Sequence, residues 1–369
     1  PAWTGIRVRM TGTSSAVLGD SGDIPADTGE DGSFLLDTIT VSEAGEGPFG
    51  PDVSIVAVST ALGTKTDTPI IDIPAAVSVV TQQELEVRNV QDLQQALAYT
   101  AGVAVDEFGS DDRYDYFRIR GFDETSNGTY RDGLPMRIAG WIAARTETYG
   151  LQRVEVLKGS TSTLFGLNSP GGIVNLITKR PLSTTHAEVL TTLGDGYIRT
   201  GTDFGGPIDE QGVWSYRFTG LWQDADRDQD YSIDDRLYFA PALTFSPTDS
   251  TTLTILTDYS KTKTNAGYGF PYGVDIDPNT FLGEPDFNKF DTEQGDIGYL
   301  FEHDFATGLV FRQNARYTHI DLDYEQVYGG AIDPSVNREA FAVYSSGNRF
   351  AIDNQLQYDT EWNWAESKS

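Results

Sequence analysis

The second half of the chain repeats a pattern that makes one face of each β-strand aromatic and the other face polar. In "VWSYRFTGLWQD", side chains alternate between two faces, as they do in any extended strand. Trp214, Tyr216 and Trp222 therefore share one face, and Arg217 and Gln223 share the other. The segments "RLYFAPALTF", "TTLTILTDYS" and "GLVFRQNARYTHI" repeat this arrangement. Aromatic side chains facing outward and polar side chains facing inward are typical of the strands of a transmembrane β-barrel.

The connections between these segments support the same interpretation. Short turns such as 246–250 and 306–308 alternate with long acidic connections such as 264–291, as in barrels of this kind. A soluble β-sandwich also alternates apolar and polar positions, but it does not need Arg and Asn on one face opposite Trp and Tyr. No apolar run approaches the roughly 18 residues of a transmembrane helix.

Composition excludes several other classes of function. The formal net charge of −29 argues against nucleic-acid binding, because contacts with phosphate need a surplus of Lys and Arg. The chain has no cysteine, so it has neither disulfides nor thiolate metal ligands. Its three histidines, His186, His303 and His319, are scattered. We find no catalytic triad or paired-carboxylate site, and we predict neither an enzyme, nor a resident metal site, nor a cofactor.

Residues 56–181 have the mixed pattern of a compact α+β domain. Thr81 followed by Glu84 has capping-box spacing and predicts a helix that continues along an apolar face to a stop at Gly102. Strands are expected at "AAVSVVT" before this helix and at "YFRIRGF", "TYRDGLPM", "RVEVLKG" and "GIVNLITKR" after it. The Asp132-Gly133 pair signals a turn.

The chain before this domain is predicted to be mostly extended or flexible. Residues 1–36 are small, acidic and unpatterned except for a possible strand in "WTGIRVRM", and this composition predicts a linker. Residues 37–45 form an isolated β-branched stretch between two such tracts. It either packs on the next domain or offers itself to the edge of another protein's sheet.

Several of these segments together resemble the TonB-dependent siderophore receptors of the Gram-negative outer membrane. "DTPIIDIPAAVSVVTQQEL", "DLQQALAYTAGV", "RIRGF", "YRDGLPM" and "LQRVEVLKGSTSTLFGLNSPGGIVNLITKRP" resemble the plug domain of that family, and "DTITV" resembles its TonB box. The combination "RIRGF…YRDGLPM" is similar to the ferrichrome and hydroxamate branch. The resemblance covers roughly residues 37–360, and it implies that residues 1–36 are a periplasmic linker or the remnant of a signalling domain.

This resemblance implies an architecture and partners. It implies a plug at 56–181 inside an antiparallel transmembrane barrel of about 22 strands, of which 183–369 supply the N-terminal part. It also implies a cell outer-membrane location, contact with outer-membrane lipid, and import of a ferric siderophore as the transported ligand. TonB, from the TonB–ExbB–ExbD complex, is the implied energy-delivering partner, and its binding segment is implied to be Asp37, Thr38, Ile39, Thr40 and Val41.

The resemblance also implies a binding site in the apical plug loops. The implied siderophore-binding residues are Arg118, Phe122, Arg137, Gly140, Trp141 and Tyr149. Aromatic faces suit a bulky neutral ferric chelate, and Arg side chains suit its oxygen acceptors. Other basic residues of the plug are expected to anchor it, by pairing with acidic residues of the plug or the barrel wall; they include Arg120, Arg153, Lys158, Lys179 and Arg180.

Three alternatives remain open at this level. The stretch after residue 181 has room for about seven to nine barrel strands, and the chain ends at "WNWAESKS" without a closing strand. We therefore expect a fragment of a longer receptor, or a truncated product that engages TonB without transport. The substrate of a transporting form could also be an oligosaccharide.

The acidic stretch 224–235 has the first spacings of a calcium loop, but it lacks the required glycine and is predicted to be a solvated loop.

Overall fold

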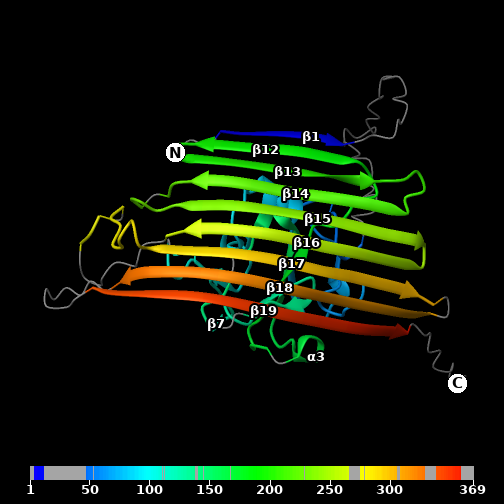
Figure 1. Ribbon diagram of the computed structural model, residues 1–369. Helices are drawn as coiled ribbons and strands as arrows, with labels where there is room; N and C mark the ends of the chain where they lie inside the picture. The colour runs from blue at the N-terminus through cyan, green and yellow to red at the C-terminus, as the bar shows by residue number, and fades with distance from the viewer. Residues whose placement is uncertain are drawn as a thin grey trace, which may run out of the picture.

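The computed structural model describes residues 4–11, 47–52, 54–109, 111, 113–137, 140–143, 145–166, 168–227, 229–265, 275–277, 279–305, 308–328 and 338–358. Within these residues, nine strands form one antiparallel sheet in the order β1-β12-β13-β14-β15-β16-β17-β18-β19. Figure 1 shows them side by side, from β1 at the top to β19 at the bottom. Their bounds are Thr4–Thr11, His186–Gly194, Tyr197–Pro207, Trp214–Ala225, Asp234–Thr248, Thr251–Thr264, Lys289–Asp304, Leu309–Tyr328 and Glu339–Tyr358.

The alternation predicted from the sequence is confirmed in this sheet. In β14, Trp214 and Trp222 are exposed, whereas Arg217 and Gln223 are buried. The buried side chains lie on the concave face of the sheet, where the N-terminal domain packs. Strand β14 thus carries a polar face toward the domain and an apolar face away from it. At the long-connection end of β18 the pattern reverses, because Leu322 and Tyr324 are buried toward the domain whereas the His319 and Asp321 side chains are 45% and 57% exposed. The predicted number of strands after residue 181 is also confirmed, since eight are present in the described part of the chain.

The two ends of the sheet differ in their connections. At one end, two residues separate β15 from β16 and four separate β17 from β18, and we call it the short-turn end. The strand ends that flank the longer segments 265–288 and 329–338 lie at the opposite end, which we call the long-connection end. The two-residue turn at 195–196, between β12 and β13, is an exception at that end. In outer-membrane barrels the short turns face the periplasm and the longer loops face outward.

The strand considered possible within residues 1–36 is present. Residues 4–11 form β1, which pairs antiparallel with β12 from Thr4↔Leu193 to Thr11↔His186. An unpaired strand edge exposes a row of backbone donors and acceptors, and β1 satisfies those of β12. The predicted strand in "WTGIRVRM" is therefore present, and its partner lies more than 170 residues away in the sequence.

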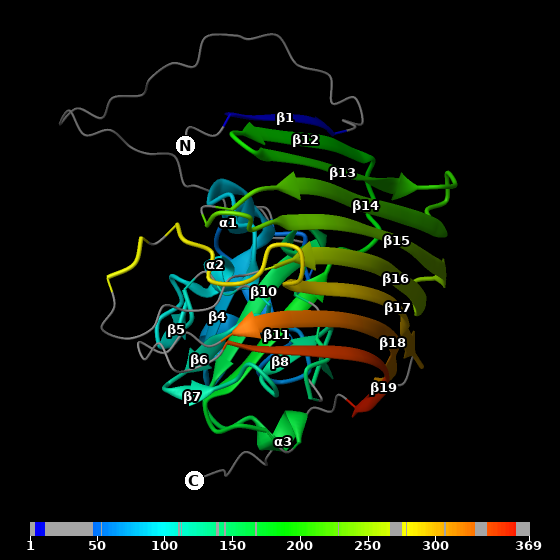
Figure 2. The same cartoon turned by 60° about the vertical axis from the view of Figure 1, so that its left-hand side comes forward.

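The N-terminal domain lies against the concave face of the nine-stranded sheet (Figure 2). Its main sheet has the order β4-β10-β11-β8-β9, with β11 and β8 parallel and the other pairs antiparallel. The strands span Ala76–Thr81, Leu151–Lys158, Gly172–Thr178, Thr129–Arg131 and Leu134–Pro135. Two smaller sheets consist of β2 and β3, Ser59–Thr60 and Thr68–Pro69, and of β5, β6 and β7, Val103–Val105, Phe117–Ile119 and Phe122–Asp123.

Short helices complete this domain. They are α1 (Gln82–Val87), α2 (Leu93–Leu97), α3 (Ser162–Phe165), η1 (Ile70–Asp72) and η2 (Thr148–Gly150). The predicted cap is confirmed, because Thr81 Oγ1 accepts a hydrogen bond from Glu84 N at 3.3 Å. No helix in the described ranges is long and apolar enough to cross a membrane.

The prediction of one helix from Thr81 toward Gly102 was wrong, since two helices occupy this stretch. The first ends at Arg88, and Asn89 adopts a positive φ of 50°. Asp92 then starts a second helix by accepting a hydrogen bond from Gln95 N at 2.7 Å. Val90 in the break and Leu93 in the second helix enter the same buried cluster as Leu85. In one straight helix Val90, five positions after Leu85, would point about 140° away from it.

Strands β10 and β11 form the centre of the domain. All seven residues of β11 are buried, and so are the first seven of β10. Val154, Val156, Val174 and Leu176 pack with α1 and α2 in one cluster. Gly172, where β11 begins, has a φ of 139°, and a Cβ there would lie 2.1 Å from Leu157 O. Glycine is therefore required where the chain returns from α3 beside β10.

Candidate functional site

Buried ion pairs attach the N-terminal domain to the sheet, and three groups of them stand out among the described residues, besides a pair of Arg145 with Asp234 of β15 at 3.2 Å. The first joins Lys179 to Asp203 of β13, at 2.7 Å from Nζ to Oδ2, and Arg217 of β14 contacts the same carboxylate at 2.7 Å. The second joins Glu147 to Arg199 and Arg236, at 3.1 and 3.3 Å. The third joins residues of β8 and the following turn to β16, β17 and β18; it consists of Arg131, Asp132, Asp258, Asp296 and Arg316.

Not every basic residue expected to anchor the domain reaches the sheet. Lys179 does, as described above, and burial lowers the pKa of its ammonium even beside Asp203. Arg153 instead pairs within the domain, at 2.8 Å from Asp52 and 3.7 Å from Glu155. Lys158 also stays within the domain, where its Nζ donates to Ser78 Oγ at 2.9 Å. The anchoring is therefore divided between the domain's own core and the sheet.

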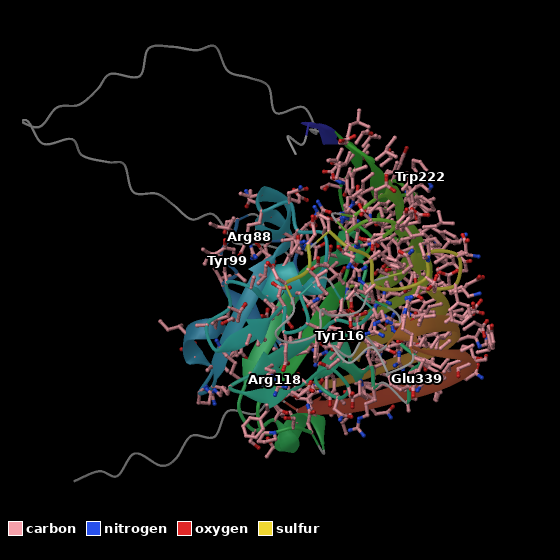
Figure 3. All side chains as sticks on the ribbon, turned by 90° about the vertical axis from the view of Figure 1, so that its left-hand side faces the viewer. Arg88, Tyr99, Tyr116, Arg118, Trp222 and Glu339 are labelled. Carbon is pink, nitrogen blue, oxygen red and sulfur yellow. The ribbon has the colours of Figure 1, made fainter. Side chains whose placement is uncertain are left out.

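An aromatic cluster joins the domain to the sheet at the long-connection end. We call it the outer aromatic cluster; it consists of Tyr114, Tyr116, Phe290, Tyr324 and Phe341. Ring centroids of successive members lie 4.9–5.7 Å apart in edge-to-face geometry, the favoured arrangement for aromatic pairs. Figure 3 places Tyr116 between the domain and the curved sheet.

Polar groups border the outer aromatic cluster. Arg113 donates to Tyr324 Oη and to Gln326 Oε1, the latter at 2.8 Å, and it pairs with Asp111. Burial raises the pKa of the Tyr114 and Tyr116 hydroxyls, so both remain neutral at physiological pH. The cluster therefore combines aromatic surface with neutral hydroxyls and one guanidinium.

Of the predicted site residues, Arg137, Gly140 and Trp141 lie beside this cluster. The Trp141 ring is 6.3 Å from that of Tyr324, and its carbonyl accepts a hydrogen bond from Tyr114 Oη at 2.9 Å. The Trp141 side chain is 54% exposed, so the indole forms an open rim above buried rings. Gly140 is exposed with a φ of 64°.

Arg137 lines a cavity of about 110 Å³ next to the cluster, which we call the outer cavity. Its other lining residues include Tyr114, Ile142, Gln294, Thr318 and Asn348. Ligand pockets usually enclose about 300–1,000 Å³, so the outer cavity accommodates one end of a drug-sized molecule. The exposed face of Trp141 would contact the remainder of such a molecule.

The other three predicted site residues lie elsewhere. Arg118 is held by Glu107, at 2.7 and 2.8 Å, beside the Phe108–Tyr116 ring pair. Phe122, in β7, is exposed. Tyr149 packs against Gly201 of β13, where a Cβ would lie 2.7 Å from its ring, and Lys179 Nζ sits 4.3 Å from the ring centroid. Four strand spacings separate β13 from β17, about 19 Å, so Tyr149 does not join the cluster.

The predicted TonB-binding segment, Asp37 to Val41, lies outside the described residues. Sequence reasoning did not select the members of the outer aromatic cluster. The alternation in "RYDYF" is the one local signal that could have drawn attention to Tyr114 and Tyr116. Over the described ranges, no group of three or more His, Asp or Glu side chains is placed to hold a metal ion.

Comparison with known proteins gives a family for the N-terminal domain. Residues 69–173 match the TonB-dependent Receptor Plug Domain. The ferrichrome outer membrane transporter/phage receptor of Escherichia coli K12 is 36% identical over 317 residues, covering 81% of this chain and 42% of that protein. The ferrioxamine receptor of Yersinia enterocolitica is 35% identical over 342 residues, covering 89% and 48%. The chain thus spans less than half the length of these relatives.

Solved structures share the fold. The Pseudomonas aeruginosa receptor FpvA, bound to pyoverdines, superimposes with a TM-score of 0.76 at 23% identity, covering 85% of this chain and 43% of that one. The ferric preacinetobactin receptor BauA of Acinetobacter baumannii gives a TM-score of 0.73 at 20% identity, covering 84% and 47%. The relatives named here are receptors and a transporter rather than enzymes.

Proposed function

Because the chain belongs to the family of TonB-dependent receptors, we propose that it acts in the import of a ferric siderophore across the Gram-negative outer membrane. The N-terminal domain is the plug of that family, and the nine-stranded sheet is the wall around it. The ligand binds at the long-connection end and leaves toward the short-turn end. The protein performs no covalent chemistry on the ligand.

The observation that carries this proposal is the outer aromatic cluster with Trp141 as its exposed rim. A ferric hydroxamate is a bulky chelate with CH and amide surface and oxygen acceptors. Aromatic faces bind the former, and the Arg137 guanidinium donates hydrogen bonds to the latter. The names of the two curated relatives, which refer to ferrichrome and ferrioxamine, support the hydroxamate class.

We further propose that TonB supplies the energy. Residues 37–41, "DTITV", precede the plug and have the β-branched composition of a strand. Such a segment can add to the edge of a partner's sheet through main-chain hydrogen bonds. Binding of the ligand shifts the plug toward a state in which this segment is available, which requires the ligand to prefer that state.

Tryptophan fluorescence tests the ligand class. Titration of the protein with a ferric hydroxamate is expected to quench Trp141, because the coloured chelate lies against the indole. The Trp141→Phe variant should lose most of this quenching. Trp222→Phe is the matched control, since Trp222 is similarly exposed at 46% but lies on the outward face of β14.

The same titration separates this proposal from its alternatives. Quenching by a ferric hydroxamate, with none by an oligosaccharide, supports the proposal. Equal quenching of the wild type and of Trp141→Phe would place the ligand elsewhere and contradict the assigned site. Saturable binding of an oligosaccharide alone would contradict the siderophore class.

A further inference from the structure

Features of the plug–sheet contact follow one another in order along β17, β18 and β19. At the long-connection end lies the outer aromatic cluster, at Phe290, Tyr324 and Phe341. The outer cavity follows, at Gln294 and Thr318. Then come Asp296 and Arg316 of the third ion-pair group. We call this row of contacts the seam between the plug and β17–β19.

A larger cavity continues the seam toward the short-turn end. This inner cavity encloses about 460 Å³ and touches the sheet at 300–302 of β17, 312–314 of β18, and Asp353 and Gln355 of β19. Phe290 and Leu300 are ten positions apart on β17, which is about 33 Å of strand. The outer aromatic cluster and the inner cavity therefore lie at opposite ends of one path, and the inner cavity has the volume of a ligand pocket.

The lining of the inner cavity suits the same class of ligand as the outer site. Phe49, Leu62 and Phe165 supply apolar surface. Arg180 supplies a cation, whereas the Lys65 ammonium is paired with Asp353 at 3.0 Å, and the carboxylates of Glu155 and Glu302 also line the cavity. Arg180 stacks over Phe49 at 4.1 Å, and its nearest carboxylate, Asp132, is 3.9 Å away. Its Nε is buried without a hydrogen-bond partner in the described part of the chain. Asp132, Glu155 and Glu302 therefore balance this guanidinium only from a distance, without a close ion pair, so it can still bind a ligand oxygen.

Between the two cavities lies the third ion-pair group, and the two cavities share no lining residue. Arg316 Nη2 contacts Asp132 Oδ2 at 2.6 Å, and Arg131 Nη2 contacts Asp258 Oδ2 at 2.7 Å. Asp132 and Arg131 belong to the plug, whereas Arg316 and Asp258 belong to the sheet. Asn314 also donates to the Asp132 carbonyl. These contacts close the seam between its outer and inner parts.

The contacts that close the seam are ion pairs rather than packed apolar side chains, and ion pairs separate in a different way. Replacing a buried ion pair by packed apolar side chains is often neutral or stabilising, so the closure is not explained by stability alone. Once water or a polar ligand enters, the separated charges are solvated again. The closure can therefore open locally, by separation of two ion pairs, without detaching the apolar core of the plug.

We propose that the ligand passes along the seam between the plug and β17–β19, from the outer site to the inner cavity, and that the Asp132–Arg316 and Arg131–Asp258 pairs are the barrier it crosses. The inner cavity is its second binding station. This inference rests on the proposed function and adds a route to it. The rest of the plug stays attached during passage, including the Lys179–Asp203–Arg217 group on β13 and β14.

Cross-linking distinguishes this route from departure of the whole plug. The chain has no native cysteine, so Asp132→Cys with Arg316→Cys can be bridged across the seam by a reversible bifunctional thiol reagent. Lys179→Cys with Asp203→Cys is the matched control, because it also ties the plug to the sheet but away from the seam. Both pairs are made in the intact protein in the outer membrane, and ferric hydroxamate uptake is measured before bridging, after bridging, and after reduction.

The expected result is loss of uptake with the 132/316 bridge, recovery on reduction, and retained uptake with the 179/203 bridge. Loss of uptake with both bridges would mean that the whole plug moves, and uptake unaffected by the 132/316 bridge would mean that the ligand takes another path. Either result overturns the inference. Trp141 quenching is recorded in parallel, so absence of ligand binding by the wild type refutes the proposed function rather than the route.

Single cysteines provide a second measurement that leaves the ion pairs of the barrier in place. Thr125→Cys lines the outer cavity, at a half-buried position of the plug, and Thr254→Cys lines the inner one. With a bulky thiol reagent added from outside, we expect position 125 to react at rest. Position 254 should react several-fold faster only when ligand and TonB energy are both present. Equal labelling of position 254 at rest and during uptake would contradict a barrier at this point.

Discussion

The Asp203 carboxylate offers a quantitative test of how the plug is held. Asp203 is fully buried and accepts hydrogen bonds from Lys179 Nζ at 2.7 Å and from Arg217 Nε and Nη2 at 2.8 and 2.7 Å. Asp203→Asn keeps the shape of the side chain but removes its charge. Two buried cations then lose their counterion, and removal of one partner of a buried pair costs about 3–5 kcal/mol. We expect the free energy of unfolding to fall by that amount.

The measurement is guanidinium unfolding of the purified chain in detergent micelles, followed by tryptophan fluorescence. Glu293→Gln is the matched control, because it neutralises a carboxylate in the Lys261–Glu293 pair, where both side chains are nearly half exposed at a distance of 3.2 Å. Exposed pairs contribute less than about 1 kcal/mol, so the control should unfold almost as the wild type does.

A second substitution tests the cause. Lys179→Met removes one of the two cations, so the double variant Asp203→Asn/Lys179→Met leaves only Arg217 uncompensated. Its cost should be smaller than the sum of the two single costs, as expected for residues that share one network. The reasoning is refuted if Asp203→Asn costs no more than Glu293→Gln, or if the two single costs simply add.

Three further predictions concern the plug. Burial raises the pKa of Glu124 to about 7 from 4.5; because the folded state binds its proton more tightly, stability should fall as pH rises from about 4.5 to 7, and Glu124→Gln should remove that fall in pH-dependent unfolding. Gly172→Ala should destabilise the plug more than Gly109→Ala in urea unfolding, because only the former meets backbone, whereas the latter, at a φ of 60° in open space, costs about 1–2 kcal/mol. Thr81→Ala should cost about 1 kcal/mol through loss of the cap, measured by the unfolding midpoint.

The structure brings together the candidate site residues that belong to one contiguous loop, but not those that come from other segments. Arg137, Gly140 and Trp141 belong to one loop and lie together at the outer site. Tyr149 lies only eight positions after Trp141, but its side chain packs against Gly201 of β13, away from the outer site. A position beside a motif cannot reveal which strand of the sheet a side chain will face, because the sheet is not yet defined.

The sequence by itself determined the repeating elements. A strand exposes one face to apolar surroundings and the other to polar ones, and this local period of two can be read from any segment of β14 or β15. The cap at Thr81 and the glycine at the start of β11 are equally local, since each depends on one backbone conformation.

Only the tertiary structure decided which of these elements meet. Arg113 and Tyr324 are separated by 211 positions, and Asp132 and Arg316 by 184. In the sequence, every Arg carries the same positive charge and every Asp the same negative charge, so the sequence does not show which of them pair. The pairs depend on which strands the plug faces and on which residues of those strands it contacts. The outer aromatic cluster, the barrier and the inner cavity arise from that register. They are properties of the packed plug and sheet, because each requires side chains that the chain brings together only on folding.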